Sequence, residues 1–414
     1  MSEFINNNQT KRKEAIKEAL KQIHAGVPYE EVRSLFAEVL QNASSQEIAD
    51  IEEALISEGL PVEDIQYLCD VHVALFRDSL DQQAAPEMMP GHPVYTFRAE
   101  NELANLVLNE VRKQVEKFYG NPDKEEKEKL LEQLKKLREY DRHYERKENL
   151  LFPYLEKYGF TGPSSVMWGI HDDVRKAWKW MIKALSSANG NLKETAKSVK
   201  EKFVPMENMI REMFYKEDRI LFPNALERMS EEDWLAVYSQ EEEFGFSFVE
   251  RGKEWQGEEK TNTAPFRDKI KENEEERKKM TNLPLDTGDL TIQQINLMLA
   301  RLPVDITFVD ENDTVRYYSD TPERVFKRTP AIIGRKVQNC HPPASVDKVV
   351  EIVEDFRSGK RDLAEFWIQL NERLIYIRYF PLRDSEGNYR GTIEVSQDVT
   401  NIRKLEGEKR LLDS

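Results

Sequence analysis

Two stretches of this chain nearly repeat each other: HYERKENLLFPYLEK (143–157) and MFYKEDRILFPNALER (213–228). Each copy runs into an apolar Leu-Phe-Pro step, and each carries a carboxylate one turn or slightly more before that step. The carboxylates are Glu148 in the first copy and Glu217 in the second. Because carboxylates are metal-capable groups, both copies are candidates for a metal site.

Four long amphipathic segments contain the repeat: residues 92–119, 124–158, 163–188 and 191–229. Short polar breaks between long helices predict an up-down four-helix bundle. His92, His143 and His171 lie in or at the start of three different segments, each near carboxylates. Imidazoles and carboxylates that meet in a bundle interior are typical of non-haem iron sites. We expect Pro153 and Pro223 to end or kink their helices.

The composition limits the class of protein and of partner. A length of 414 residues predicts two or three domains, and a net charge of −16 argues against a nucleic-acid surface or an anionic membrane. Cys69 and Cys340 lie far apart, so no disulfide framework is expected. The N-terminus has no apolar run behind its basic residues, and no segment approaches about eighteen consecutive apolar residues. We therefore predict a cytoplasmic protein with no membrane partner.

The chain is predicted to be multidomain. An all-α region at 1–83 precedes the four-helix bundle at 84–236, a Glu- and Lys-rich linker at 237–285 and an α+β domain at 286–414. In the α+β domain, alternating side chains and turn signals predict one five-stranded antiparallel sheet from strands at 305–310, 314–318, 364–370, 373–382 and 389–399. Helices are expected at 291–301 and 345–358. The tail at 400–412 is predicted to be an amphipathic helix suited to a homodimer contact.

The bundle segments and their Leu-Phe-Pro steps resemble the hemerythrin-like, His-His-Glu cation-binding family over about residues 92–235. The resemblance implies a bundle that holds non-haem iron, as one or two ions, with a His from each helix and a Glu one turn after a His. Carried onto this sequence, it implies these metal ligands: His92, His143, His171, Glu148 and Glu217.

The sequence departs from that family at two positions. Lys147 stands four residues after His143, where the family has Glu, and Met213 holds the His place of the fourth segment. Glu148 follows His143 by five residues, about 140° round an ideal helix, so it needs a bulge or a long rotamer to reach the site. Missing ligands leave open positions, which favour binding of a small ligand over a closed structural role.

The segment PVEDIQYLCDVHVALF (61–76), taken with GHPVYTFRAEN (91–101), resembles the domain-of-unknown-function 438 family, which commonly precedes a hemerythrin-like bundle. Cys69 and His72 share one helix face there, a spacing that can hold iron or zinc. The simpler interpretation is a buried thiol beside a partly exposed imidazole.

The C-terminal part resembles a PAS sensory domain, through LPVDITFVDENDTVRYYS (302–319) and LRDSEGNYRGTIEVSQDVT (382–400). The resemblance implies a sheet that encloses a ligand pocket. We expect its inner face to be lined by Phe366, Ile368, Ile375 and Ile377 or their in-register neighbours. Cys340 and His341, followed by two prolines, either present an axial ligand to a haem or another redox cofactor or form a turn before the next helix.

Three functions stay open at this point. The first is a redox or gas sensor, in which non-haem iron in the bundle binds O₂ or NO and the PAS domain signals to a downstream protein. The second is a di-iron protein that scavenges O₂ or NO or repairs iron–sulfur clusters, with the PAS domain as regulator. The third is an interaction scaffold whose site is metal-binding, holding an ion such as zinc, or holds nothing. No phosphate-binding loop or nucleophile elbow is present, so no catalytic residue is predicted and an enzyme is disfavoured.

Overall fold

The computed structural model describes residues 14–23, 25–36, 47, 51, 54, 89–188, 190–252, 255, 283–321, 324–370 and 372–408. The chain divides into two compact units, one that ends at Gly257 and one that begins at Glu258. Among the described helices, none is long and apolar enough to cross a membrane.

The described part of the N-terminal region is helical, as predicted. Residues 14–23 form one helix and α2 (Tyr29–Leu35) another. Ile16, Leu20 and Val32 are fully buried. Cys69 and His72 lie outside the described residues.

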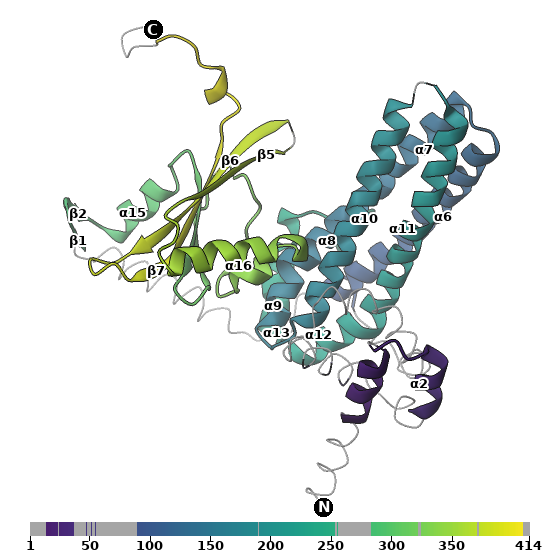
Figure 1. The fold of residues 1–414 in the computed structure, drawn as a ribbon, viewed down its shortest axis with the longest axis horizontal. Coiled ribbons are helices and arrows are strands. Elements are labelled where there is room, and N and C mark those ends of the chain that lie inside the picture. The colour runs from purple at the N-terminus through teal and green to yellow at the C-terminus, as the bar shows by residue number, and fades with distance from the viewer. Residues whose placement is uncertain are drawn as a thin grey trace, which may run out of the picture. The chain divides into compact units, whose positions relative to one another are not determined.

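The predicted bundle is confirmed, and its long helices run side by side in the first unit (Figure 1). Its elements are α6 (Pro93–Gly120), α7 (Lys124–Leu137), η1 (Arg138–Tyr140), α8 (Asp141–Arg146), η2 (Lys147–Leu151), α9 (Phe152–Glu156), α10 (Gly162–Ser187), α11 (Leu192–Lys216), η3 (Glu217–Leu221), α12 (Phe222–Arg228), α13 (Glu231–Gln240) and η4 (Glu241–Glu243). Side-chain caps fix where the helices begin: Asp123 accepts a hydrogen bond from the backbone of Glu126, and Asn191 from that of Glu194.

Both copies of the repeat contain a wide π-turn, η2 and η3, directly before the Phe-Pro step. Pro153 has no N–H to donate, and its ring crowds the carbonyl four residues earlier. A turn with one additional residue relieves that crowding, so the helix does not end at the proline. It continues to Glu156, and the second copy continues past Pro223 to Arg228. The bulge that Glu148 was predicted to need is therefore present.

The predicted linker starts too early. Residues 237–240 complete α13, and residues 241–252 and 255 fold onto the bundle. We call residues 241–252 the strap. Its Ser247 backbone N–H donates to the Glu100 carboxylate at 2.6 Å. The Glu-rich composition pointed to a solvated segment, whereas its interspersed aromatic side chains pack: the Arg146 guanidinium lies 4.6 Å from the Phe246 ring centre.

The second unit contains the predicted five-stranded antiparallel sheet. Its strands are β3 (Asp305–Asp310), β4 (Val315–Tyr318), β5 (Ala364–Leu370), β6 (Arg373–Arg383) and β7 (Tyr389–Asp398), in the order β4-β3-β7-β6-β5. The flanking helices α15 (Ile292–Leu299) and α16 (Pro343–Arg357) also agree with the prediction. A small hairpin, β1 (Leu283–Leu285) with β2 (Gly288–Leu290), was not predicted.

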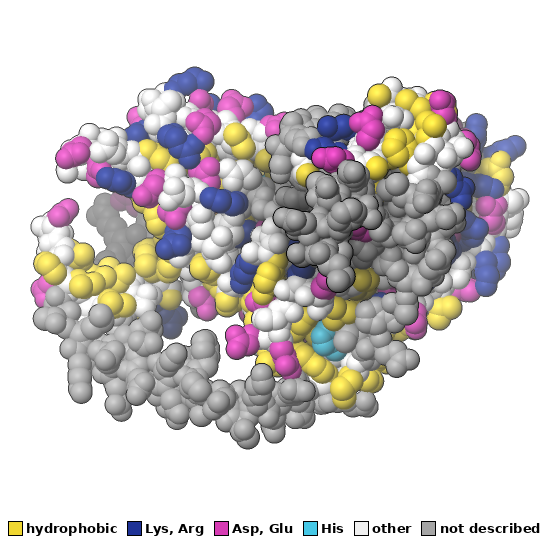
Figure 2. All heavy atoms as spheres, turned by 90° about the horizontal axis from the view of Figure 1, so that it is seen from below, with side chains coloured by type: hydrophobic (Ala, Val, Ile, Leu, Met, Phe, Trp, Pro, Cys, Tyr) yellow, Lys and Arg dark blue, Asp and Glu magenta, His cyan; other side chains and the backbone are white. Residues whose placement is uncertain are grey.

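Apolar side chains remain exposed at the hairpin and α15. No residue of α15 is buried, and Figure 2 shows apolar side chains gathered on the surface in this part of the second unit. Leu283, Leu285, Leu297 and Met298 are among them. At the other end, the predicted tail helix is wrong for residues 400–408: only the short 3-10 turn η7 (Ile402–Lys404) forms, and Leu405 is 77% exposed. A short helix with no partner for its apolar face is marginal in water.

The predicted inner face of the sheet is covered unevenly. Ile375 is fully buried, whereas its directly paired neighbour Ile368 on β5 is 37% exposed. The cover over the inner face therefore thins toward the β5 edge.

This pair of isoleucines gives a matched test of the packing. Ile375→Ala should destabilise the second unit by about 2–5 kcal/mol, because it leaves a cavity in a fully buried position. Ile368→Ala should cost clearly less, because the removed carbons already touch water. Hydrogen exchange of the β6 and β7 amides in the full chain measures both. Equal losses would show that the β5 edge is packed as tightly as the centre.

Candidate functional site

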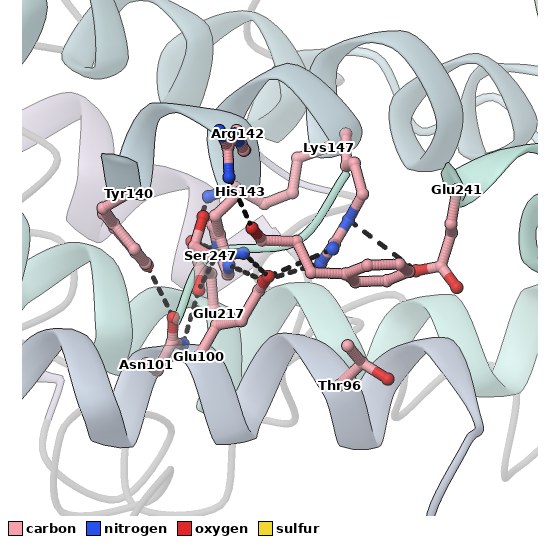
Figure 3. A network of polar contacts seen from close by, with 12 residues as sticks. Thr96, Glu100, Asn101, Tyr140, Arg142, His143, Lys147, Glu217, Glu241 and Ser247 are labelled. Atoms are coloured by element: carbon pink, nitrogen blue, oxygen red, sulfur yellow. Dashed lines mark hydrogen bonds and ion pairs between the residues drawn. The ribbon is translucent and has the colours of Figure 1, made fainter. Parts of the chain in front are cut away.

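Glu217 lies at the centre of the polar network in the bundle interior (Figure 3). It opens the π-turn η3, and its carboxylate accepts hydrogen bonds from the Lys147 ammonium and, at 2.6 Å, from the Asn101 amide. The His143 Nε2 atom lies 3.2 Å from Glu217 Oε2. Tyr140 OH donates to Asn101 Oδ1 at 2.6 Å and so orients the amide. All five side chains are buried, and they come from two α-helices (α6 and α8), the 3-10 turn η1 and the two π-turns η2 and η3.

His143 links Glu217 to a second buried carboxylate. Its Nδ1 atom lies 2.9 Å from Glu100 Oε2. Both terminal nitrogens of Arg146 donate hydrogen bonds to the same carboxylate, at 3.0 and 2.6 Å, and the backbone N–H of Ser247 in the strap donates a third. The strap therefore holds the group that orients the His143 ring.

The electrostatics of the Lys147–Glu217 pair follow from burial opposed by mutual attraction. Burial alone would raise the pKa of Glu217, but the Lys147 ammonium and His143 outweigh it and lower the pKa to about 2. Burial lowers the pKa of Lys147, and Glu217 opposes that shift. Removing either partner of such a pair leaves an uncompensated buried charge, which costs about 3–5 kcal/mol.

A second imidazole–carboxylate pair lies in the same bundle interior. The wide turn η2 buries Glu148, whose carboxylate lies 2.8 Å from His171 Nδ1 and accepts two bonds from Arg175, at 2.7 and 2.9 Å. The Tyr144 ring stacks on the His171 ring at 4.0 Å. Among the described residues, the buried His171 Nε2 atom has no hydrogen-bond partner. Burial, then the charges of Lys147 and Arg175, lower the pKa of His171 well below its usual value, which keeps the ring neutral.

These contacts test whether the donor set suits a metal ion. A histidine that ligates a metal through Nε2 usually has its Nδ1 held by a carboxylate. His143 and His171 both have that support. The Nε2 atom of His171 has no hydrogen-bond partner among the described residues, so its lone pair is available to a metal ion. In the conformation described, however, no three His, Cys, Asp or Glu side chains of the described residues lie close enough together to hold an ion. The chemistry of these side chains fits a metal ion, but in this conformation the Glu217 carboxylate is paired with the Lys147 ammonium instead.

The structure does not bring His92 into this group. His92 caps α6, where its Nδ1 atom accepts a bond from the Val94 N–H at 3.1 Å. It stands eight residues before Glu100, about 12 Å along the helix, and its ring packs against Trp234 and Trp255. Burial lowers its pKa to about 4.

The remaining candidates lie in two places. Met213 is fully buried one turn before Glu217. In the second unit, Cys340 packs on the cluster of Val309, Val315 and Ile332, and burial lowers the pKa of His341 to about 4.

Sequence reasoning missed the partners that hold the site together: Glu100, Asn101, Tyr140, Arg146, Arg175 and Ser247. Glu100 and Asn101 stand in the same motif as His92, two turns later, and Arg146 stands inside the repeat. Charged residues on amphipathic helices are ordinarily solvated, so composition gave no reason to place these side chains in the bundle interior. The available signal was helical spacing: Asn101, Leu108 and Val115 fall at seven-residue intervals on one face.

Glu241 of the strap gives a pH prediction. It is fully buried, its nearest cation is Arg146 Nε at 3.7 Å, and neither carboxylate oxygen has a hydrogen-bond partner among the described residues. Burial raises its pKa from 4.5 to about 7. Between those values the unfolded chain ionises and the folded chain does not, so stability falls as the pH rises.

Glu241→Gln should therefore raise the free energy of unfolding at pH 8 by up to about 3 kcal/mol and change it little at pH 5. Urea unfolding at both pH values measures this. Glu242→Gln is the matched control, because Glu242 is largely exposed and pairs with Arg251. A gain that is the same at both pH values would contradict the buried carboxyl as its cause.

Comparisons with known proteins agree with this architecture. Three family models match: the family of unknown function DUF438 at residues 16–82, the Hemerythrin HHE cation binding domain at 92–225 and a PAS domain at 295–400. No curated protein matches the chain.

Several solved structures match part of the chain. The C-terminal domain of a Streptococcus mutans protein is 40% identical, over 30% of this chain and 98% of its own, with a TM-score of 0.30. The PAS domain of Bordetella pertussis BvgS is 19% identical, over 27% of this chain and 92% of its own, with a TM-score of 0.23. A sensory box sensor histidine kinase from Vibrio cholerae is 12% identical, over 26% and 90%, with a TM-score of 0.21.

Proposed function

Because the chain joins a DUF438 region, a hemerythrin HHE domain and a PAS domain, we propose that it is a cytoplasmic sensor of a redox or gaseous ligand such as O₂ or NO. Iron in the bundle detects the ligand, and the PAS domain passes the signal to a downstream protein. Hemerythrin HHE domains generally bind metal ions, and sensor proteins commonly carry PAS domains.

One observation carries the iron part of the proposal. His143 and His171 each have Nδ1 held by a buried carboxylate, and His171 Nε2 has no partner among the described residues. With Glu217 they form a set of two imidazoles and one carboxylate, the donors typical of mononuclear non-haem iron. An iron ion held by His143, His171 and Glu217 would supply redox chemistry and would bind a small ligand such as O₂ or NO. Glu100 and Glu148 then act as positioning residues that fix both rings.

Lys147 sets the condition for loading. Its ammonium lies on Glu217, so a metal ion and Lys147 compete for the same carboxylate. Full loading requires the Lys147 side chain to leave Glu217. One ion is favoured over two, because positions 147 and 213, where the family has Glu and His, carry Lys147 and Met213 and offer no ligands for a second ion.

The strap supplies a route from the bundle toward the PAS domain. Glu100 holds His143 on one side and the Ser247 N–H on the other. Arg146 also donates to the Gly245 carbonyl, at 3.2 Å. A change in charge at His143 therefore acts, through Glu100 and Arg146, on the segment that leads along the sequence to the second unit.

The same site leaves one alternative with an observation in its favour. The Lys147 ammonium balances the charge of the buried Glu217 carboxylate without a metal ion. This pairing supports an interaction scaffold whose site holds no ion. Measuring the turnover of O₂ or NO by iron-loaded protein distinguishes the remaining alternative, scavenging or iron–sulfur repair, from sensing. Turnover supports the former, and binding without turnover supports sensing.

Lys147→Met removes the competing cation and keeps an unbranched chain. We expect it to raise iron per chain at least twofold after anaerobic reconstitution, measured by elemental analysis. His171→Ala should lower it at least threefold, because the supported imidazole is lost while the apolar packing of the bundle remains.

The matched control is Lys200→Met, which removes an outer ion pair with Glu116 on the same bundle and should leave iron unchanged. Circular dichroism establishes that each variant is folded. Iron content that is the same in His171→Ala and in the unsubstituted protein would overturn the site and support the scaffold.

A further inference from the structure

A group of charged side chains lies on the inner face of the PAS sheet. Asp305 on β3 and Glu394 on β7 occupy neighbouring rows, since Asp305 pairs with Ser396 and Thr307 pairs with Glu394. Both carboxylates are buried. Inner-face positions of a small sheet are ordinarily apolar, so this polar strip across the middle of the face needs a reason.

Two arginines from the segment between β4 and α16 face these carboxylates. Arg324 Nη2 lies 3.5 Å from Asp305, and Arg328 Nη2 lies 3.7 Å from Glu394. Charge-assisted N–H···O bonds are normally about 2.7–2.9 Å long, so neither guanidinium makes a tight pair. Both arginine side chains are only 14% exposed.

Arg324 Nε donates to the Phe326 carbonyl oxygen at 2.9 Å, but the rest of this guanidinium is incompletely paired. Arg324 Nη1 is buried and has no hydrogen-bond partner among the described residues. Arg328 makes no hydrogen bond with any described residue, and its only close carboxylate is Glu394. Burial lowers the pKa of Arg324, which expresses the cost of keeping that charge incompletely paired. Buried donors of this kind ordinarily have an acceptor.

Electrostatic interactions link Arg328 to three further polar side chains, those of Glu394, Tyr379 and His341. Burial raises the pKa of Glu394, and the positive charge of Arg328 opposes that shift. Burial raises the pKa of Tyr379, which keeps the phenol neutral. Burial, and then the positive charges of Arg328 and Arg335, lower the pKa of His341 to about 4, which keeps the imidazole neutral. An incoming group would therefore meet two guanidinium groups, the neutral side chains of Tyr379 and His341, and the carboxyl groups of Asp305 and Glu394.

We propose that Arg324 and Arg328 form a binding site for a small organic carboxylate on the inner face of the PAS sheet. The guanidinium fork matches the two oxygens of a carboxylate and satisfies the donors that the protein leaves unpaired. A carboxylate group, with one negative charge shared by two oxygens, suits the site better than a doubly charged phosphate group, because Asp305 and Glu394 lie beside it. This site is independent of the iron in the bundle, so either assignment can fail alone.

Titration calorimetry of the full-length protein with acetate and with succinate tests the site, at pH 7 and fixed ionic strength. Phosphate, sulfate and uncharged glycerol are the comparison ligands. We expect saturable binding of at least one carboxylate, with one site per chain. Arg328→Gln should weaken it at least tenfold, and Arg328→Lys, which keeps the charge but loses the fork, at least threefold.

Arg316→Gln is the matched control, because Arg316 is largely exposed and pairs with Asp310 outside the group. It should leave the affinity unchanged. The proposal is overturned if neither acetate nor succinate binds, if phosphate or sulfate binds more tightly, or if folded Arg328→Gln keeps full affinity. Should Arg328→Gln not fold, Arg328→Lys decides by the threefold criterion. A Soret band on haemin addition that His341→Ala abolishes, and that succinate competes away, assigns the arginines to haem propionates and also overturns it.

Discussion

The wide turn that precedes each Phe-Pro step is the constraint on which the bundle interior depends. A proline inside a helix removes one donor and crowds a carbonyl, and the chain accommodates both by adding a residue to the turn before it. In η2 this buries Lys147 and Glu148 together. In η3 it buries Glu217, while the next residue, Asp218, pairs with Arg98 near the surface. The same device in two helices thus delivers a cation and an anion to one place.

The charges delivered in this way explain the rest of the network. A buried carboxylate is costly unless it is paired and hydrogen-bonded, and each of the three nearest the histidines has its own cation. Glu217 has Lys147, Glu148 has Arg175, and Glu100 has Arg146. The strap completes the last pair with a backbone N–H, which is why a Glu-rich segment is ordered here.

The sequence allowed the elements to be predicted better than their contacts. The strands at 305–310 and 364–370 were found to the residue, because side-chain alternation and turn residues are local signals. The need for a bulge at Glu148 also followed from local spacing. The pairing of Glu148 with His171 and Arg175 did not, because it depends on how helices rotate against one another. The tail at 400–408 was predicted wrongly for a related reason: amphipathic spacing shows that a helix is compatible with the residues, but its stability depends on a partner.

The two units carry opposite kinds of unmet hydrogen-bonding capacity. In the bundle, the neutral His171 ring leaves a nitrogen lone pair without a donor, a position that accepts a cation. In the PAS domain, Arg324 leaves an N–H without an acceptor, a position that accepts an anion. Ligands of opposite charge cannot exchange between such sites, since each interior disfavours the other's ligand. The strap contacts Glu100 in the bundle and leads along the sequence toward the PAS domain.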